Sequence, residues 1–259
     1  MNTNEDFDTP TTERQGIQVI SRMAALLRAL ENRPEGLSLG ELAKAVDLPR
    51  STVQRIVDAL DSEGFVMAAS TSSGVRLGPA LLALAASTRF HIAEVARQTL
   101  EKLAKECGET VDLSLVDQDK VVFVDKVSGT HRLTAVSAVG LSFSLHSSAN
   151  GKAVLAAMPD EEIAKLKRRL RLTPVTPNTM TTWDQLDLEI LKIRKQGLAY
   201  DREENSLGIS AVSVALRSSS GELAAISIPV PTQRFNETEK ELSKALLKHC
   251  GQLQLKLNR

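Results

Sequence analysis

SLGELAKAVDLPRSTVQRIVDALDSEGFVMAASTSSGVR, residues 38–76, predicts two short helices followed by a β-hairpin. The Ser38 hydroxyl can cap the first helix, and the Glu41 side chain can reach back to the backbone N–H of the capping residue. The first helix would end before Pro49, which suits the start of a second helix because a first turn leaves its N–H groups unpaired. Gly64 suits the left-handed residue that follows a helix end. This spacing predicts a helix-turn-helix.

The second helix has one apolar face and one polar face. Its apolar residues recur at the i, i+3, i+4, i+7 spacing of a buried stripe: Val53, Ile56, Val57 and Leu60. The opposite face carries side chains that can bond DNA bases or phosphates: Arg50, Ser51, Thr52, Gln54 and Arg55. Arg can grip guanine and Gln adenine with two parallel bonds, while hydroxyl groups can donate to phosphate. The pattern therefore predicts a recognition helix.

A candidate β-wing follows this helix. Residues 65–67 and 75–77 read as two strands, and residues 70–74 read as the turn between them. Arg76 would lie on this wing, close to the DNA backbone or minor groove. A preceding helix over about residues 15–31 would complete the domain with four inward side chains: Ile20, Met23, Leu27 and Leu30.

Charge does not decide whether these helices bind DNA, and two short amphipathic helices also occur in folds that do not. Residues 11–80 hold eight Lys and Arg and eight Asp and Glu, whereas nucleic-acid binders usually have a basic surplus. A neutral domain would need dimerisation and sharply localised contacts to bind DNA tightly.

Length and composition fit a globular protein with two modest domains or one large one. The 259 residues are 42% apolar and 25% charged, with a formal net charge of zero. No signal peptide and no apolar run of about 18 residues is present, and Cys107 and Cys250 form no motif. We therefore expect a reduced, cytoplasmic protein without a membrane partner. The expected parts are a disordered arm (1–14), a first domain (15–78), a linker helix (79–97) and a second domain (98–259).

The second domain reads as a mixed α+β fold. Six runs rich in apolar residues predict strands at residues 111–116, 121–127, 132–139, 198–203, 209–216 and 222–230. Helices are predicted at residues 91–107, 149–157, 160–170 and 182–196, and in a final segment that Asn236 would cap. Two meanders separated and flanked by helices favour a six-stranded antiparallel sheet over a parallel one.

No catalytic or metal-binding constellation is recognisable by spacing. The four histidines lie far apart and form no HxH or HxxxH motif: His91, His131, His146 and His249. We therefore expect no catalytic residues, no bound metal and no cofactor. Two alternatives to a DNA-binding regulator stay open. One is a small-molecule hydrolase or transferase whose N-terminal helices serve oligomerisation, and the other is a ligand-binding adaptor that does not touch DNA.

Three polar features allow two interpretations each. Gly151-Lys152 at a helix start lacks the upstream glycine of a phosphate loop, so it is either an anion-attracting helix end or a packing turn. Asp201, in the acidic run of residues 201–204, faces either solvent or a ligand. Three further residues are either sheet serines or pocket donors: Ser210, Ser213 and Ser227.

Four segments together resemble the IclR family of bacterial transcriptional regulators. They are LPRSTVQR (48–55), LHSSANGKA (145–153), GLAYDREEN (197–205) followed by Gly208, and AISI (225–228) followed by Pro231 and Arg234. The resemblance runs from about Gly16 to the last helix. It implies a winged helix-turn-helix domain, a helical linker and a C-terminal GAF/PAS-like domain that binds a small effector. It also implies a homodimer, often paired again into a tetramer, on a double-stranded DNA operator.

The resemblance carries functional residues over to this chain. Arg50, Gln54 and Arg55 would read bases, while Ser51, Thr52 and Arg76 would hold phosphates. The family's effector-pocket positions correspond to Ala135, Phe143, Ala149, Asn150, Asp201, Ile209, Ala211, Ser227 and Pro229.

The chain departs from the family at the pocket. Ala211 stands where members often have Cys, Ala215 where they often have Pro, and Pro229-Val230 where they often have Ser-Gly. Losing a thiol and a hydroxyl removes polar groups from the pocket. We therefore expect a small organic acid, or an aromatic or lactone-like catabolite, as effector.

Overall fold

A computed structural model describes residues 12–31, 33–67, 74–87, 91–135 and 137–258. The chain divides into two compact units, residues 1–89 and residues 90–259. Residues 1–11 of the predicted arm and most of the predicted turn at residues 70–74 lie outside the described residues. Residues 12–14 were expected in the arm, but they form the first turn of a helix.

The first unit contains the predicted helices and wing. In order it holds α1 (Thr12–Ala29), α2 (Leu39–Ala45), α3 (Arg50–Ser62), β1 (Val66–Met67) and β2 (Arg76–Leu77). The two strands pair antiparallel, as expected for a wing. The helix-turn-helix prediction is thereby confirmed.

Local signals fix the ends of these helices. The Ser38 backbone N–H donates to Glu41 Oε2 at 2.8 Å, and the Glu41 N–H donates to Ser38 Oγ at 3.3 Å, so the capping box is present. Asp47 has a φ of +51°, and Gly64, one residue past the C-cap of α3, has a φ of +70°. An Asp or Gly tolerates this left-handed region better than a branched side chain does.

The core of the first unit joins all three helices to the wing. Its buried members are Leu26, Leu30, Leu42, Val53, Val57, Leu60, Val66 and Val75. The prediction that Ile20 faces inward was wrong, because burial in this part of the chain begins further along, at Leu26 of α1 and Leu30 just after it, and leaves Ile20 65% exposed.

The predicted linker at residues 79–97 spans parts of both units. It contains α4 (Ala80–Ser87) in the first unit and the beginning of α5 (His91–Cys107) in the second. Ile92 and Ala96 of α5 are fully buried in the core of the second unit, so the beginning of α5 belongs to that unit. The division between the units therefore falls between residues 89 and 90 rather than after residue 97.

The second unit is built on a six-stranded antiparallel sheet, which confirms the predicted α+β class. The strands lie in the order β5-β4-β3-β8-β7-β6. Their bounds are β3 Val111–Asp117, β4 Lys120–Val127, β5 Ser142–Ser144, β6 Ala199–Arg202, β7 Ile209–Arg217 and β8 Leu223–Pro231.

The strand predicted at residues 132–139 was wrong. The third strand is β5, and it begins only at Ser142. The segment before it turns back onto the sheet, where Ala135 and Ser137 are buried, and it rejoins β4 when the Phe123 N–H donates to Leu141 O at 2.9 Å. Ala135 and Ser137 therefore cover part of the sheet instead of belonging to a strand that pairs with β4.

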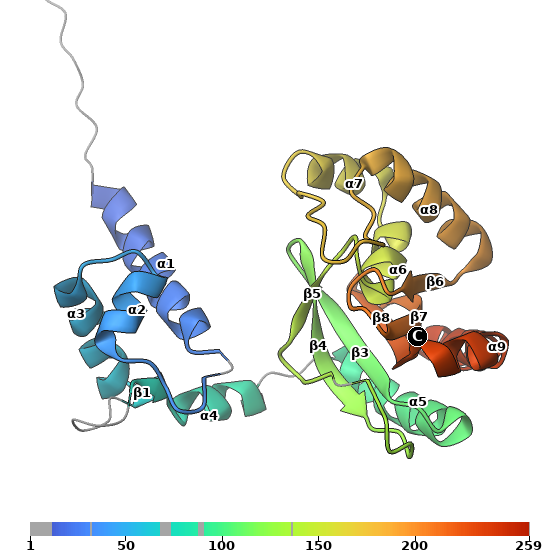
Figure 1. Cartoon of the computed structure of the whole chain (residues 1–259), viewed down its shortest axis with the longest axis horizontal. Coiled ribbons are helices and arrows are strands. Elements are labelled where there is room, and N and C mark those ends of the chain that lie inside the picture. Colours follow the sequence, from blue (N-terminus) through green and yellow to red (C-terminus); the bar gives the residue numbers. More distant parts are fainter. Residues whose placement is uncertain (1–11, 32, 68–73, 88–90, 136, 259) are drawn as a thin grey trace, which may run out of the picture. The chain divides into compact units, whose positions relative to one another are not determined.

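Helices cover both faces of this sheet (Figure 1). On one face lie α5 and α9 (Thr232–Leu257), whose apolar side chains share a core with β3, β7 and β8. On the other face, a second core brings together α6 (Ala149–Ala157), α7 (Asp160–Lys167) and α8 (Trp183–Gln196).

The last helix begins earlier than predicted. It starts at Thr232 after Pro231, so Asn236 lies inside it and does not cap it. The additional turn buries Phe235 completely and places its ring 6.5 Å from that of Tyr200 in an edge-to-face contact. Burial of this aromatic side chain outweighs the local capping signal.

Candidate functional site

The outer face of α3 presents the predicted DNA-contacting side chains. Arg50, Ser51 and Arg55 are exposed, while Thr52 and Gln54 are half-buried. The buried stripe on the opposite side anchors the helix, so these side chains project away from the core. The Gln54 amide donates to Asp58 Oδ1 at 2.7 Å, one turn further along the helix.

The wing contributes a second cationic surface. Arg76 is exposed on β2, and its neighbour Val75 bridges back to Leu37, which holds the wing against the start of α2. A groove beside the wing is lined by Arg76 and by Arg33, which the sequence reading did not single out. Only the three-dimensional pairing of the wing brings these two arginines to one groove.

All nine predicted effector-pocket residues line one cavity in the second unit. The empty space between these residues is about 530 Å³ and is partly open to solvent. The nine are Ala135, Phe143, Ala149, Asn150, Asp201, Ile209, Ala211, Ser227 and Pro229. The sequence reading missed six further lining residues: Asp112, Phe123, Ser137, Ser148, Asn205 and Ser206.

Strand register explains why residues distant in sequence share this cavity. Asp112 on β3 lies opposite Ser227 on β8. Two residues further along β8, Pro229 lies opposite Ala211 on β7, and Ala211 lies opposite Asp201 on β6. Because paired residues point to the same side of a sheet, these four strands form one floor.

Asp112 is a buried carboxyl group with one unpaired oxygen. Its Oδ1 accepts a hydrogen bond from the Ser137 hydroxyl at 2.6 Å. Its Oδ2 is buried and has no hydrogen-bond partner among the described residues. Burial raises the pKa of Asp112 to about 6, although the Ser137 hydroxyl and the Lys126 ammonium oppose the rise.

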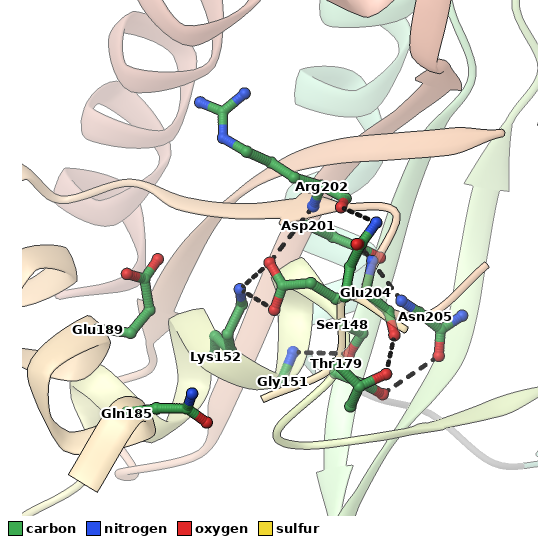
Figure 2. Close-up of polar contacts among 12 residues, drawn as sticks. Ser148, Gly151, Lys152, Thr179, Gln185, Glu189, Asp201, Arg202, Glu204 and Asn205 are labelled. Carbon is green, nitrogen blue, oxygen red and sulfur yellow. Dashed lines mark hydrogen bonds and ion pairs between the residues drawn. The ribbon is translucent and has the colours of Figure 1, made fainter. Parts of the chain in front are cut away.

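Asp201 is the second buried carboxyl group at the cavity. Its Oδ1 accepts the backbone N–H of Glu204 at 2.7 Å and that of Asn205 at 3.3 Å (Figure 2). Burial raises the pKa of Asp201 to about 7, and the adjacent Glu204 carboxylate adds to the rise, against the backbone bonds and Lys152. The side chain of Asp201 is therefore buried and lines the cavity, rather than lying at a solvated edge.

Lys152 does not offer its charge to a ligand. It is fully buried, and its Nζ lies 2.6 Å from both carboxylate oxygens of Glu204 (Figure 2). In α6, the Ser148 hydroxyl caps the Gly151 N–H at 3.1 Å, and a Cβ at Gly151 would lie 2.4 Å from Leu145 Cα. The start of α6 is therefore a tightly packed turn rather than a phosphate loop.

The rest of the cavity wall mixes apolar side chains with serine and asparagine side chains. Phe123 and Phe143 meet edge to face with ring centroids 5.0 Å apart. Asn150 turns its amide toward β3, where it donates to Ser114 Oγ at 2.8 Å. The two carboxyl groups are the charged side chains of the lining, and Ser227, Asn205 and Ser206 add polar groups to it.

Other polar residues have structural partners. Ser213 donates to Ile226 O at 2.9 Å and Ser210 pairs with Thr232, so these two are sheet serines, whereas Ser227 lines the cavity. His146 pairs with Thr173 O and His249 with Glu106. Within the described residues, no cluster of His, Cys, Asp and Glu could hold a metal ion. None of the helices described there is long and apolar enough to cross a bilayer.

Comparison with known protein families matches both units. Residues 19–68 match the IclR helix-turn-helix domain, and residues 84–254 match the C-terminal domain of the bacterial transcriptional regulator IclR. The chain belongs to the IclR family. It is therefore a transcriptional regulator with a DNA-binding domain and an effector-binding domain, and not an enzyme.

Individual IclR-family relatives agree with this assignment. An HTH-type transcriptional regulator of Mycobacterium tuberculosis is 48% identical over 236 residues, which span 91% of each chain. The IclR structure from Thermotoga maritima has a TM-score of 0.71 at 31% identity and covers 94% of this chain and 100% of its own. An IclR homologue of Microbacterium hydrocarbonoxydans, complexed with 4-hydroxybenzoate, has a TM-score of 0.77 and covers 92% of this chain and 98% of its own. At 21% identity, it shows the fold alone.

Proposed function

We propose that this IclR-family regulator binds its operator through α3 and the wing, with Arg50, Gln54 and Arg55 on bases and Ser51, Thr52 and Arg76 on phosphates. The observation that carries this proposal is the outer face of α3, where Arg50 and Arg55 are exposed at the helix start while Val53 and Val57 anchor the opposite side. A recognition helix uses its N-terminal residues in this way.

The effector proposal assigns the cavity to the molecule that controls DNA binding. Its proposed contacts are Ala135, Phe143, Ala149, Asn150, Asp201, Ile209, Ala211, Ser227 and Pro229. Support comes from their convergence on one cavity, which Asp112 also lines. The effector changes operator affinity because it binds two arrangements of the recognition helices with unequal affinity.

The regulator acts as a cytoplasmic homodimer, and two dimers pair on longer operators. The charge balance of residues 11–80 favours dimerisation, since a neutral domain gains DNA affinity by presenting two recognition helices. A symmetric partner would also cover Leu82 of α4, a large apolar side chain that is 74% exposed in the single chain. Sedimentation of the purified chain distinguishes a dimer from a monomer and from a tetramer.

The DNA part is tested with duplex DNA from upstream of the protein's own coding region. Fluorescence anisotropy across a salt series should show specific binding that weakens steeply as salt rises, because phosphate contacts release counterions. Equal affinity for this duplex and for a scrambled duplex of the same length would refute specific operator recognition.

The effector part is tested at Asp201. Asp201→Asn keeps an oxygen that can accept the Glu204 and Asn205 N–H groups, whereas Asp201→Ala removes it and loosens the loop. We expect Asp201→Asn to abolish the rise in melting temperature caused by effector while operator binding stays intact. An unchanged effector response would remove Asp201 from the contacts.

A further inference from the structure

The cavity is acidic and offers no cation to a ligand. Asp112 and Asp201 both line it, and none of its described lining residues is Lys, Arg or His. The two nearby lysines are engaged elsewhere. Lys152 Nζ lies between the two Glu204 oxygens, and Lys126 Nζ donates to Ser137 O at 2.7 Å. At pH 8, above the pKa values of about 6 and about 7, both carboxyl groups are ionised, and a carboxylate placed in this cavity would face like charges.

The cavity is lined by a buried hydrogen-bond acceptor that lacks a donor. Asp112 is 1% exposed, and its Oδ2 lacks a partner among the described residues, while Ser137 already occupies Oδ1. A buried acceptor without a donor is unfavourable, and a ligand hydroxyl group would relieve it. Asp112 lies on the rigid central strand β3, so the position of this acceptor is fixed by the sheet.

Part of the wall presents aromatic and apolar surface. The edge-to-face pair Phe123 and Phe143 forms one side, and Pro229, Ala211 and Ile209 add apolar surface. An aromatic ring packs well against such surfaces and needs no polar partner of its own. Polar contacts come from the carboxyl groups and from uncharged lining residues such as Ser227.

We propose that the effector is an uncharged aromatic molecule carrying a hydroxyl group that donates to Asp112, and that Asp112 makes the cavity reject carboxylates. This inference rests on the proposed effector role of the cavity and names the chemical class of its ligand. It replaces the small organic acid expected from the sequence with a neutral hydrogen-bond donor. Asp201 reinforces the preference as a second acidic group on the same floor.

Three ring compounds of similar size separate charge from donor capacity. They are 4-hydroxybenzyl alcohol, which is neutral with donors, 4-hydroxybenzoate, which is anionic, and 4-methylanisole, which is neutral without a donor. Isothermal titration at pH 8 with the full-length protein should show the alcohol binding at least ten-fold more tightly than either of the others. Because all three are tested on the unmodified protein, this comparison does not depend on how a variant folds.

Asp112→Asn tests which residue sets the preference. The amide is nearly isosteric and uncharged, so 4-hydroxybenzoate should bind at least ten-fold more tightly to this variant than to the unmodified protein. Asp117→Asn is the matched control, because it removes the same charge from an exposed position at the end of the same strand. It should leave all three affinities unchanged. Circular dichroism confirms that each variant is folded.

The outcomes are distinct. Binding of 4-hydroxybenzoate as tight as that of the alcohol, binding of 4-methylanisole as tight as that of the alcohol, or no binding of the alcohol would each overturn the ligand class. An unchanged preference in Asp112→Asn would overturn the role of Asp112. Anisotropy with operator DNA is measured on the same samples, so a failure of the regulator function is recognised separately as loss of specific DNA binding.

Discussion

Lys152 Nζ lies 2.6 Å from both carboxylate oxygens of Glu204, and both side chains are buried. The same Glu204 donates its backbone N–H to Asp201 Oδ1 and accepts a hydrogen bond at its carbonyl from Thr179 Oγ1 at 2.6 Å. Glu204 therefore connects α6 to the loop that positions Asp201. The pair fixes the geometry of the cavity floor.

Breaking this pair should destabilise the protein strongly. Lys152→Met leaves the Glu204 carboxylate buried without its cation, a change that typically costs about 3–5 kcal/mol of unfolding free energy. Urea denaturation at pH 7 measures the loss. Lys192→Met is the control, because Lys192 is exposed on α8 and its 3.4 Å pairing with Glu189 contributes little.

The double variant Lys152→Met/Glu204→Gln distinguishes charge from packing. Removing both charges leaves no buried ion without a partner, so the double variant should be more stable than Lys152→Met alone. If the losses of unfolding free energy caused by the two single substitutions instead add up in the double variant, the buried pair contributes through packing and the electrostatic argument fails.

Because the pKa of Asp112 is raised in the folded state, the contribution of this group to the unfolding free energy should fall as the pH rises. The carboxyl group holds its proton in the folded state up to about pH 6, but in the unfolded state only up to its ordinary value of 3.8. Its stabilising contribution is therefore full below the unfolded pKa and is lost as pH rises through the folded one. Asp112→Asn removes this titration, so between pH 5 and pH 8 the variant should gain about 1 kcal/mol relative to the unmodified protein. Urea denaturation at pH 5 and at pH 8 measures the unfolding free energies of both proteins. A difference between the two proteins that is the same at both pH values would contradict the prediction.

Two helical glycines should respond in opposite ways to alanine. Gly151 in α6 packs so closely that a Cβ would lie 2.4 Å from Leu145 Cα, whereas a Cβ at Gly251 in α9 has nothing within 4 Å. Gly251→Ala should raise the unfolding free energy by about 0.5–1 kcal/mol, because alanine loses less entropy in a helix. Gly151→Ala should lower it by about 1–3 kcal/mol because the backbone must shift. Thermal unfolding of the pair tests this contrast, and equal signs would refute the close approach.

Local patterns predicted most of the elements, since caps, turns and apolar spacing act within a few residues. The capping box at Ser38, the left-handed Gly64 and the helix over residues 149–157 all follow from such neighbours. The alternation in residues 132–139 was misread as a strand because the constraint there is distant. Ser137 donates to Asp112 Oδ1 at 2.6 Å and its carbonyl accepts from Lys126 Nζ at 2.7 Å, so side chains of β3 and β4 hold this segment, which forms no strand.

The candidate site was only partly predictable for the same reason. Family resemblance supplied Asp201, but nothing adjacent in sequence indicates that Asp112 lies opposite Ser227, a pairing across more than a hundred residues. Likewise Arg234, which the resemblance singled out, forms a two-bond contact with the buried Glu109, with Nη2 2.9 Å from Oε2. Its part in the structure is to join α9 to the start of β3. Such long-range pairings need the register of the sheet.

Arg55 tests the DNA-reading face of α3 most directly. Arg55→Ala should weaken operator binding by about 1–3 kcal/mol, because it removes a two-bond contact to a base edge. Arg55→Lys keeps the charge but not the planar fork, so it should lose nearly as much affinity if Arg55 reads a base and little if it holds a phosphate. Arg76→Ala, on the wing, should instead weaken specific and scrambled duplexes alike and reduce the salt slope by about one. Arg169→Ala, an exposed arginine of the effector domain, serves as the control. Anisotropy titrations with both duplexes measure all four variants, and unchanged specificity in Arg55→Ala would exclude Arg55 from base recognition.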